Sequence, residues 1–291
     1  MTLERRRMLK ATNNKPARGF VRGVAVALGL AVLAAAAAPV QAQTVAAASR
    51  APVDPTATTY ACGAPAEFAY FSYPLRHTAQ RLAAGQPLTI VAIGSSSTAG
   101  AGASSPAASY PSRLAAELRQ RFPGRDITVL NRGVNGQESP QMVARFGTDV
   151  IAAHPNLVLW QVGTNSVLRD EPLKPHSVVL QDGIAQLKAA GADVVLINMQ
   201  FAPRVLAKPE TEGMEDQITL AAKVASVDLF DRFAIMRNWH DVQHIPFEVF
   251  TAPDQLHMSD WSYACVAKLL ATAIGEASAR PVASAAMRSA R

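Results

Sequence analysis

The chain has 291 residues, 49% of them apolar, which is enough for one sizeable α/β domain with a buried core. The net charge of +6 comes from residues 1–42, which carry seven basic side chains and one acidic one, so the remainder is neutral overall. Because residues 43–291 carry no net charge, they lack the basic surface that binding to nucleic acid requires. This argues against DNA or RNA as a partner.

Residues 1–42 have the pattern of a secretory signal. A basic stretch precedes an uncharged apolar run, and small residues at Val40 and Ala42 predict cleavage after Ala42. The alternative is a membrane anchor, but the apolar run is about 16 alanine-rich residues and a span needs roughly 20. The run of arginines at residues 5–7 also resembles a twin-arginine signal, so the export route stays open. We therefore predict a periplasmic or secreted protein with no membrane span after cleavage.

Two cysteines, Cys62 and Cys265, follow the predicted cleavage site. In an exported protein such a pair favours a disulfide over the alternative of two separate buried thiols. Residues 43–60 are rich in Ala, Thr, Pro and Ser and are predicted to form a flexible linker. The domain itself is predicted at 61–275, and the Ala-, Ser- and Arg-rich tail at 276–291 is predicted to be disordered.

Strands and helices alternate through this domain. Residues 61–86 are assigned only loosely, with Phe68, Phe71 and Leu75 on one helical face. Short apolar runs predict strands at 88–94, 127–130, 157–162, 193–199 and 227–230. Helical periodicity predicts helices at 110–122 and 213–225. End signals mark three more: one that begins at Ser139 as its cap, a separate one that ends at Gly191, and a last one that begins after the cap Ser259. Residues 236–250 stay ambiguous. This order predicts the α/β class, with a parallel sheet covered by helices on both faces.

Three of the expected strands end in glycine and small polar residues. The first runs into Gly94, three serines and Thr98; the second into residues 131–136; the third into Gly163, Thr164 and Asn165. The carboxyl ends of parallel strands share one edge of the sheet, which is where open α/β folds place their sites. We therefore expect these polar groups to meet.

An acid and a base follow near the C-terminus, at Asp254 and His257. Three residues apart on a turn, the carboxylate can lie beside the imidazole and hold it in one tautomer, as in Ser-His-Asp sites. Serine is a weak nucleophile until such a base takes its proton, and the oxyanion that results needs N–H donors. The sequence thus contains every part of a serine-hydrolase site.

These four blocks resemble the SGNH hydrolase superfamily, also called GDSL-type esterases and lipases. Residues 94–100 match the first block, Gly-Asp-Ser-x-x-x-Gly, and the register places the nucleophile on Ser96. Ser95 stands where that block has Asp, which leaves Ser95 and Ser97 as neighbouring alternatives. The superfamily's Asp at this position is not the triad acid, so loss of activity does not follow from the change.

The resemblance also implies roles for the other blocks. The oxyanion donors would be the N–H groups of Ser96 and Gly136 and the side chain of Asn165, with Gly133 as the neighbouring alternative to Gly136. Asp254 and His257 would be acid and base. The implied fold is a three-layer α/β/α sandwich, flavodoxin-like, with about five parallel strands. The implied activity is hydrolysis of carboxylic esters, with small acyl or O-acetyl groups on a small molecule or glycan, without metal or cofactor.

Two further residues are candidates for substrate binding. Gln200 follows the fourth strand at the same edge, and Trp261 could line the pocket or simply pack within the last helix. Two other readings of the chain remain. A flavodoxin-like protein could bind phosphate with the N–H groups of the serine-rich loop, and a non-catalytic cell-envelope module could use the same fold.

Overall fold

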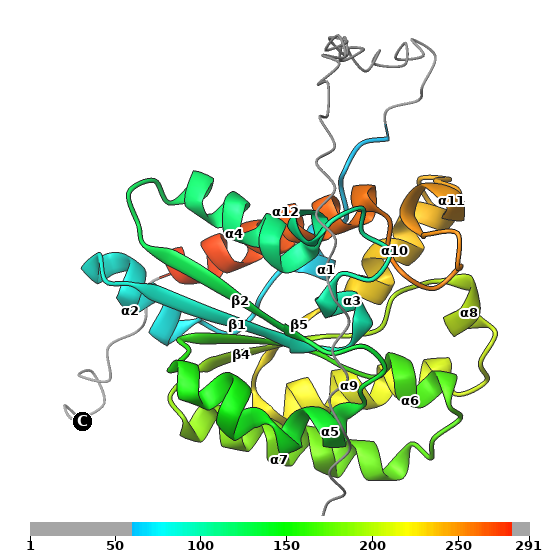
Figure 1. The fold of residues 1–291 in the computed structure, drawn as a ribbon, viewed down its shortest axis with the longest axis horizontal. Coiled ribbons are helices and arrows are strands. Elements are labelled where there is room, and N and C mark those ends of the chain that lie inside the picture. The colour runs from blue at the N-terminus through cyan, green and yellow to red at the C-terminus, as the bar shows by residue number, and fades with distance from the viewer. Residues whose placement is uncertain (1–59, 281–291) are drawn as a thin grey trace, which may run out of the picture. The chain divides into compact units, whose positions relative to one another are not determined.

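The structure is a computed structural model that describes residues 60–280 (Figure 1). Its centre is one sheet of five parallel strands in the order β2-β1-β3-β4-β5. The strands are β1 (Leu88–Gly94), β2 (Ile127–Gly133), β3 (Leu157–Gln161), β4 (Asp193–Ile197) and β5 (Asp228–Phe230). The predicted α/β/α fold with a five-stranded parallel sheet is confirmed.

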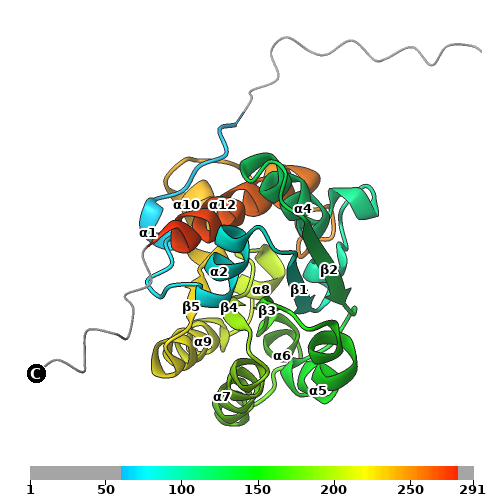
Figure 2. The same cartoon turned by 90° about the vertical axis from the view of Figure 1, so that its left-hand side faces the viewer.

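Helices cover both faces of the sheet, as Figure 2 shows. One layer contains α2 (Arg76–Ala84), α4 (Tyr110–Arg121), α10 (Arg232–Asp241) and α12 (Asp260–Ala279). The opposite layer contains α5 (Ser139–Ala144), α6 (Thr164–Leu168), α7 (Lys174–Ala189) and α9 (Thr211–Ala225). Short helices complete the described part: α1 (Ala66–Ala69), α3 (Ser96–Ala99), α8 (Pro203–Leu206) and α11 (Phe247–Phe250).

Strand β1 lies between β2 and β3, and its pairing aligns the loops that matter for the site. Ile90 to Ile93 are fully buried, as expected for a strand covered on both faces. Gly94 pairs with Gly133 of β2, and Ile93 pairs with Trp160 of β3. The carboxyl ends of the three strands therefore meet at one edge, as predicted.

Strand β2 is longer than its apolar run. The predicted strand ends at residue 130, but pairing with β1 continues to Gly133. The backbone of β1 offers partners up to Gly94, and this tertiary pairing extends β2 through polar residues that carry no strand signal of their own. Asn131 and Gly133 are consequently part of the sheet edge rather than of a loose turn.

The single helical face predicted from Phe68, Phe71 and Leu75 is wrong. Phe68 lies in α1, Leu75 is the N-cap of α2, and Phe71 lies in the connection between them. The backbone N–H groups of this connection bind Oδ1 of Asp228, from Ser72 at 2.6 Å and from Tyr73 at 3.1 Å. These contacts with the start of β5 replace helical hydrogen bonds.

Two other helix ends differ from the prediction. Glu138, not Ser139, caps α5, in a capping box with Gln141, so that Ser139 is the first helical residue. Helix α12 begins at the predicted cap Ser259 but continues to Ala279, so the predicted disorder is wrong for residues 276–279. Burial of Ile274 and Ala277 against the core explains this extension.

Cys62 and Cys265 form a disulfide with a Cα–Cα distance of 5.4 Å, as predicted. The bond joins the segment before α1 to α12 across 203 residues of sequence. The predicted signal at 1–42, residues 43–59 of the predicted linker, and residues 281–291 lie outside the described part. Between residues 60 and 280, no helix combines the length and the apolar character that crossing a membrane requires.

Replacing Cys62 with Ala should lower the free energy of unfolding by about 2–5 kcal/mol, because a bond that closes so long a loop restricts the unfolded chain. Urea unfolding of the oxidised protein measures this. Reduced wild-type protein should unfold at the midpoint of the variant. Equal midpoints for oxidised wild type and variant would contradict the prediction.

Candidate active site

Ser96 is the accessible member of the serine run that follows β1. It begins helix α3 and is half-buried, whereas Ser95 and Ser97 are each 1% exposed. Gly94 makes this tight strand-to-helix turn feasible, since a Cβ there would lie 2.2 Å from Oγ1 of Thr98. Of these three serines, only Ser96 is not fully buried.

The hydroxyl of Ser96 contacts His257 directly. Its Oγ lies 2.8 Å from Nε2 of His257, and Nδ1 of the same ring lies 2.5 Å from Oδ2 of Asp254. The other carboxylate oxygen of Asp254 accepts the backbone N–H groups of Leu256 at 3.0 Å and His257 at 2.9 Å. The structure thus brings together the three side chains that the sequence predicted as nucleophile, base and acid.

Hydrogen bonding keeps Asp254 ionised. Partial burial acts to raise the pKa of its carboxyl, but the hydrogen bonds from the His257 ring and from two backbone N–H groups outweigh this, and the pKa lies below its usual value. A carboxylate at this place fixes the Nδ1–H tautomer of His257. Nε2 is then the acceptor that faces Ser96.

The loop after β2 distinguishes the two candidate oxyanion glycines. The N–H of Gly133 donates to Oδ1 of Asn131 at 2.9 Å, and a Cβ on Gly133 would collide with the backbone of Ala99. Within residues 60–280, the N–H groups of Gly136 and Ser96 make no hydrogen bond. Gly133 therefore serves packing, and Gly136 keeps an available donor.

Asn165 belongs to α6, directly after β3. Its Nδ2 donates one hydrogen to the carbonyl oxygen of Gln137 at 2.8 Å, which leaves the second amide hydrogen available. Arg169 of the following turn donates to the carbonyl oxygen of Gly136 at 2.8 Å. Both contacts tie the Gly136 loop to the end of β3.

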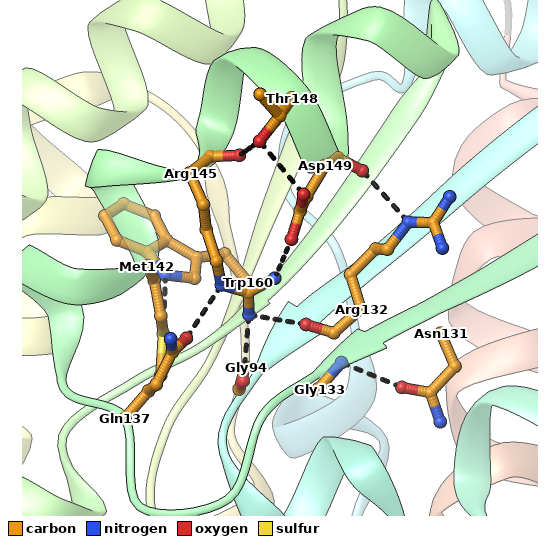
Figure 3. Close-up of polar contacts among 10 residues, drawn as sticks. All are labelled: Gly94, Asn131, Arg132, Gly133, Gln137, Met142, Arg145, Thr148, Asp149 and Trp160. Carbon is orange, nitrogen blue, oxygen red and sulfur yellow. Dashed lines mark hydrogen bonds and ion pairs between the residues drawn. The ribbon is translucent and has the colours of Figure 1, made fainter. Parts of the chain in front are cut away.

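Arg145, which the sequence analysis missed, anchors the same loop from its other side (Figure 3). Its guanidinium donates to the carbonyl of Arg132 at 2.5 Å, to Oε1 of Gln137 at 2.7 Å and, more weakly, to the carbonyl of Gly94 at 3.4 Å. It also forms an ion pair with Asp149 at 2.7 Å. A lone arginine at a helix end carries no sequence signal for this role, because its partners are set by the tertiary fold.

Gln200 is not placed to bind substrate, so that prediction is wrong. The residue does follow β4 at the predicted edge, but its side chain turns inward and is 1% exposed. Its amide hydrogen-bonds to groups of the protein, among them Arg232, Thr164 and Leu256. The strand predicts the position of the residue along the sheet but not the direction of its side chain.

Trp261 is half-buried and packs against an aromatic ring of α10. Its ring lies edge-on to Trp239, with centroids 4.9 Å apart and planes at 70°. Trp239 in turn donates to the carbonyl of Gly63 at 2.7 Å, close to the disulfide. This supports the packing alternative for Trp261.

The loop after β1 is poorly suited to the phosphate-binding alternative. The N–H of Ser95 donates to Oε1 of Gln161 at 2.9 Å, and the N–H groups of Thr98 and Ala99 donate to the carbonyl of Ser95. Most N–H groups that would cradle an anion are therefore already bonded. Gln161, a polar residue ending the apolar strand β3, is a further residue that the sequence analysis did not single out.

A cavity of about 390 Å³ adjoins the loop that carries Asp254. Its walls include Phe247 and Glu248 of α11, Pro203 of α8, and Gln255. Another cavity, of about 330 Å³, is lined by Asp193 and by residues at the start of β5, which places it at the opposite edge of the sheet. In the described part of the chain, no group of three His, Cys, Asp or Glu side chains is arranged to hold a metal ion.

Several known proteins are similar to this chain. An arylesterase from Vibrio mimicus is 33% identical over 95 residues, which are 33% of this chain and 46% of that protein. The structure resembles a two-domain esterase active on acetylated mannans, with a TM-score of 0.63 and 19% identity, over 73% of this chain and 56% of the other. The chain thus spans about half the length of these two relatives.

An acetyl xylan esterase from Geobacillus stearothermophilus has the same fold, with a TM-score of 0.56 and 20% identity over 65% of this chain and 94% of the other. Residues 61–280 match the protein family described as Non-GDSL lipase-like. That description agrees with Ser95 at the place where the first block of GDSL enzymes has Asp. Because the match spans most of the sequence, the chain belongs to the Non-GDSL lipase-like family, within the SGNH hydrolase superfamily that its four blocks resemble.

Proposed function

We propose that the protein is an exported serine esterase that removes small acyl groups, acetyl foremost, from the hydroxyl groups of a small molecule or glycan. The observation that carries the proposal is the chain of contacts from Ser96 Oγ to His257 Nε2 and from His257 Nδ1 to Asp254. A surface serine needs no such aligned partners, whereas a nucleophile needs both.

The chemistry follows from this geometry. Ser96 Oγ attacks the acyl carbon while Nε2 of His257 takes its proton, and Asp254 stabilises the imidazolium. The N–H groups of Ser96 and Gly136 and the Asn165 amide hold the oxyanion. His257 then gives the proton to the leaving alcohol, which departs and leaves the acyl group on Ser96. A water molecule, deprotonated by His257, releases the carboxylic acid and restores the serine.

The relatives support the substrate class. Those whose substrates are named act on aryl esters, acetylated mannans or acetyl xylan, all of them esters with an alcohol or phenol leaving group. The disulfide between Cys62 and Cys265 supports export, because such bonds persist in oxidising compartments. The basic and apolar pattern of residues 1–42 supports it as well.

Hydrolysis of p-nitrophenyl acetate, butyrate and octanoate by the purified protein tests the proposal. We expect turnover that declines with acyl length, and release of acetate from acetylated xylo- or manno-oligosaccharides. A folded protein that hydrolyses none of these and does not react with a fluorophosphonate would contradict it. That outcome would favour the non-catalytic binding module.

Replacing Asn165 with Ala should lower kcat by about 10²–10³ with little change in KM, since one oxyanion donor is lost. Steady-state kinetics with p-nitrophenyl acetate measure this. Asn156→Ala is the matched control, because Asn156 accepts the N–H of Thr89 at the opposite end of the sheet. An equal loss of kcat in both variants would contradict a role for Asn165 in the site.

Replacing Arg145 with Lys should lower kcat about tenfold, because an ammonium cannot bridge Arg132 and Gln137 as the guanidinium does. Arg119→Lys is the control, since Arg119 donates to the carbonyl of Ile127 at the other end of β2. The kinetic comparison is made on protein whose folding is verified by circular dichroism. If both variants retained wild-type kcat, the Gly136 loop would not depend on Arg145.

A further inference from the structure

We propose that Gln200 is a positioning residue that fixes the nucleophile, oxyanion and base segments relative to one another, with Arg232 holding its amide in place. The proposal rests on the proposed function for its kinetic meaning. The structural part of the proposal is that one buried amide is hydrogen-bonded to three loops, and it depends only on those contacts.

The amide of Gln200 reaches all three loops. Its Oε1 accepts the hydroxyl of Thr164 at 3.0 Å and, at the long distance of 3.5 Å, that of Ser97. Its Nε2 donates to the carbonyl oxygen of Leu256 at 3.2 Å. Gln200 itself follows β4, so one side chain joins segments from four parts of the chain.

Each partner is the chain neighbour of a group assigned to the chemistry. Ser97 follows Ser96, Thr164 precedes Asn165, and Leu256 precedes His257. Ser96 and His257 are 161 positions apart in the sequence, so the backbone alone cannot fix their distance. Tertiary contacts must do so, and a misplacement of about 1 Å in an active site can cost about 10² in rate.

Arg232 determines which way the amide faces. Its side chain is fully buried, and its Nη2 lies 3.0 Å from Oε1 of Gln200, while Nε and Nη2 also donate to the carbonyl of Asn198 at 3.1 and 2.6 Å. A guanidinium only donates, so the acceptor end of the amide must face Arg232 and Thr164. Nε2 is thereby directed to Leu256, beside His257.

The charge on Arg232 strengthens this arrangement. Burial lowers its pKa to about 10, so it stays cationic at neutral pH. Burial, and the nearby charge of Asp231, raise the pKa of neighbouring Glu215 to about 8. Gln200 Oε1 and the Asn198 carbonyl accept from Nε and Nη2 of the Arg232 cation, whereas its Nη1 has no hydrogen-bond partner among the described residues.

The test compares Gln200→Leu, which removes every contact, with Gln200→Glu, which keeps an acceptor for Thr164 and Arg232 but loses the donor to Leu256. We expect kcat to fall about 10- to 100-fold in the first variant and less in the second, with KM within about twofold of wild type. Thr78→Val is the control. It removes a buried hydroxyl bond to Asp193 at the opposite edge of the sheet, and kcat should be unchanged.

A second readout does not depend on turnover. The NMR resonances of the His257 ring, assigned with His257→Ala, should shift in Gln200→Leu and stay in place in Thr78→Val. Unchanged kcat and unchanged ring resonances in folded Gln200→Leu would overturn the proposal, as would equal effects in Thr78→Val. If the wild type hydrolysed no ester, the proposed function would fail while the ring resonances still decided whether Gln200 positions His257.

Discussion

Replacing Ser96 with Ala is expected to lower kcat by about 10⁶, leaving only the residual catalysis that an oxyanion site and substrate binding provide. The cause is direct: without Oγ, no acyl-enzyme forms, and His257 has no hydroxyl from which to take a proton. Kinetics with p-nitrophenyl acetate measure the loss, and circular dichroism verifies that the half-exposed position tolerates Ala.

Ser95→Ala and Ser97→Ala are the matched controls, one residue to either side. Both side chains are buried, and Ser95 donates to Gln161 Oε1 at 3.0 Å rather than to His257. These variants should lose some stability but keep kcat within about tenfold of wild type, as expected for a neutral internal hydrogen bond. If either control were inactive while Ser96→Ala turned over, the assignment of the nucleophile would be wrong.

Replacing Asp254 with Asn is expected to lower kcat by about 10⁴ while the fold is retained. An amide can donate to Nδ1 of His257, and this places the ring proton on Nε2, where it can no longer accept the proton of Ser96. Because the pKa of Asp254 lies below its usual value, the wild-type carboxylate stays ionised through the neutral range. The loss in the variant should therefore persist throughout that range.

Asp260→Asn is the control for this change. Asp260 accepts the N–H and the hydroxyl of Ser104, its pKa is also lowered by these bonds, and it begins α12 shortly after His257. Its amide variant should retain wild-type kcat. Full activity in Asp254→Asn would contradict the proposed role of Asp254.

The parts of the site that the sequence predicts are those with strict local chemistry. Gly94 has no room for a Cβ, and its place at the end of an apolar strand marks the turn that presents Ser96. Asp254 and His257 meet through a short turn, so their spacing suffices to predict the contact. The alternation of strands and helices predicts a parallel sheet, and the carboxyl ends of parallel strands bring these segments to one edge.

The remaining parts depend on contacts between distant segments. Gln200 is predicted at the correct edge, but its amide turns inward to Arg232, Thr164 and Leu256, which lie on other segments. Arg145 has no pattern that distinguishes it from a surface arginine, since its acceptors lie on β1, β2 and the Gly136 loop. Likewise, binding of Ser72 and Tyr73 to Asp228 overrides the local helical signal before α2.

The most direct test of the account is to react the folded protein with a fluorophosphonate and map the adduct by peptide mass spectrometry. We expect one adduct, on Ser96, formed at least 100-fold more slowly in His257→Ala because general-base activation contributes about 10²–10⁴. An adduct on another residue, or equal labelling in wild type and His257→Ala, would contradict the claim that Ser96 is a nucleophile activated by His257.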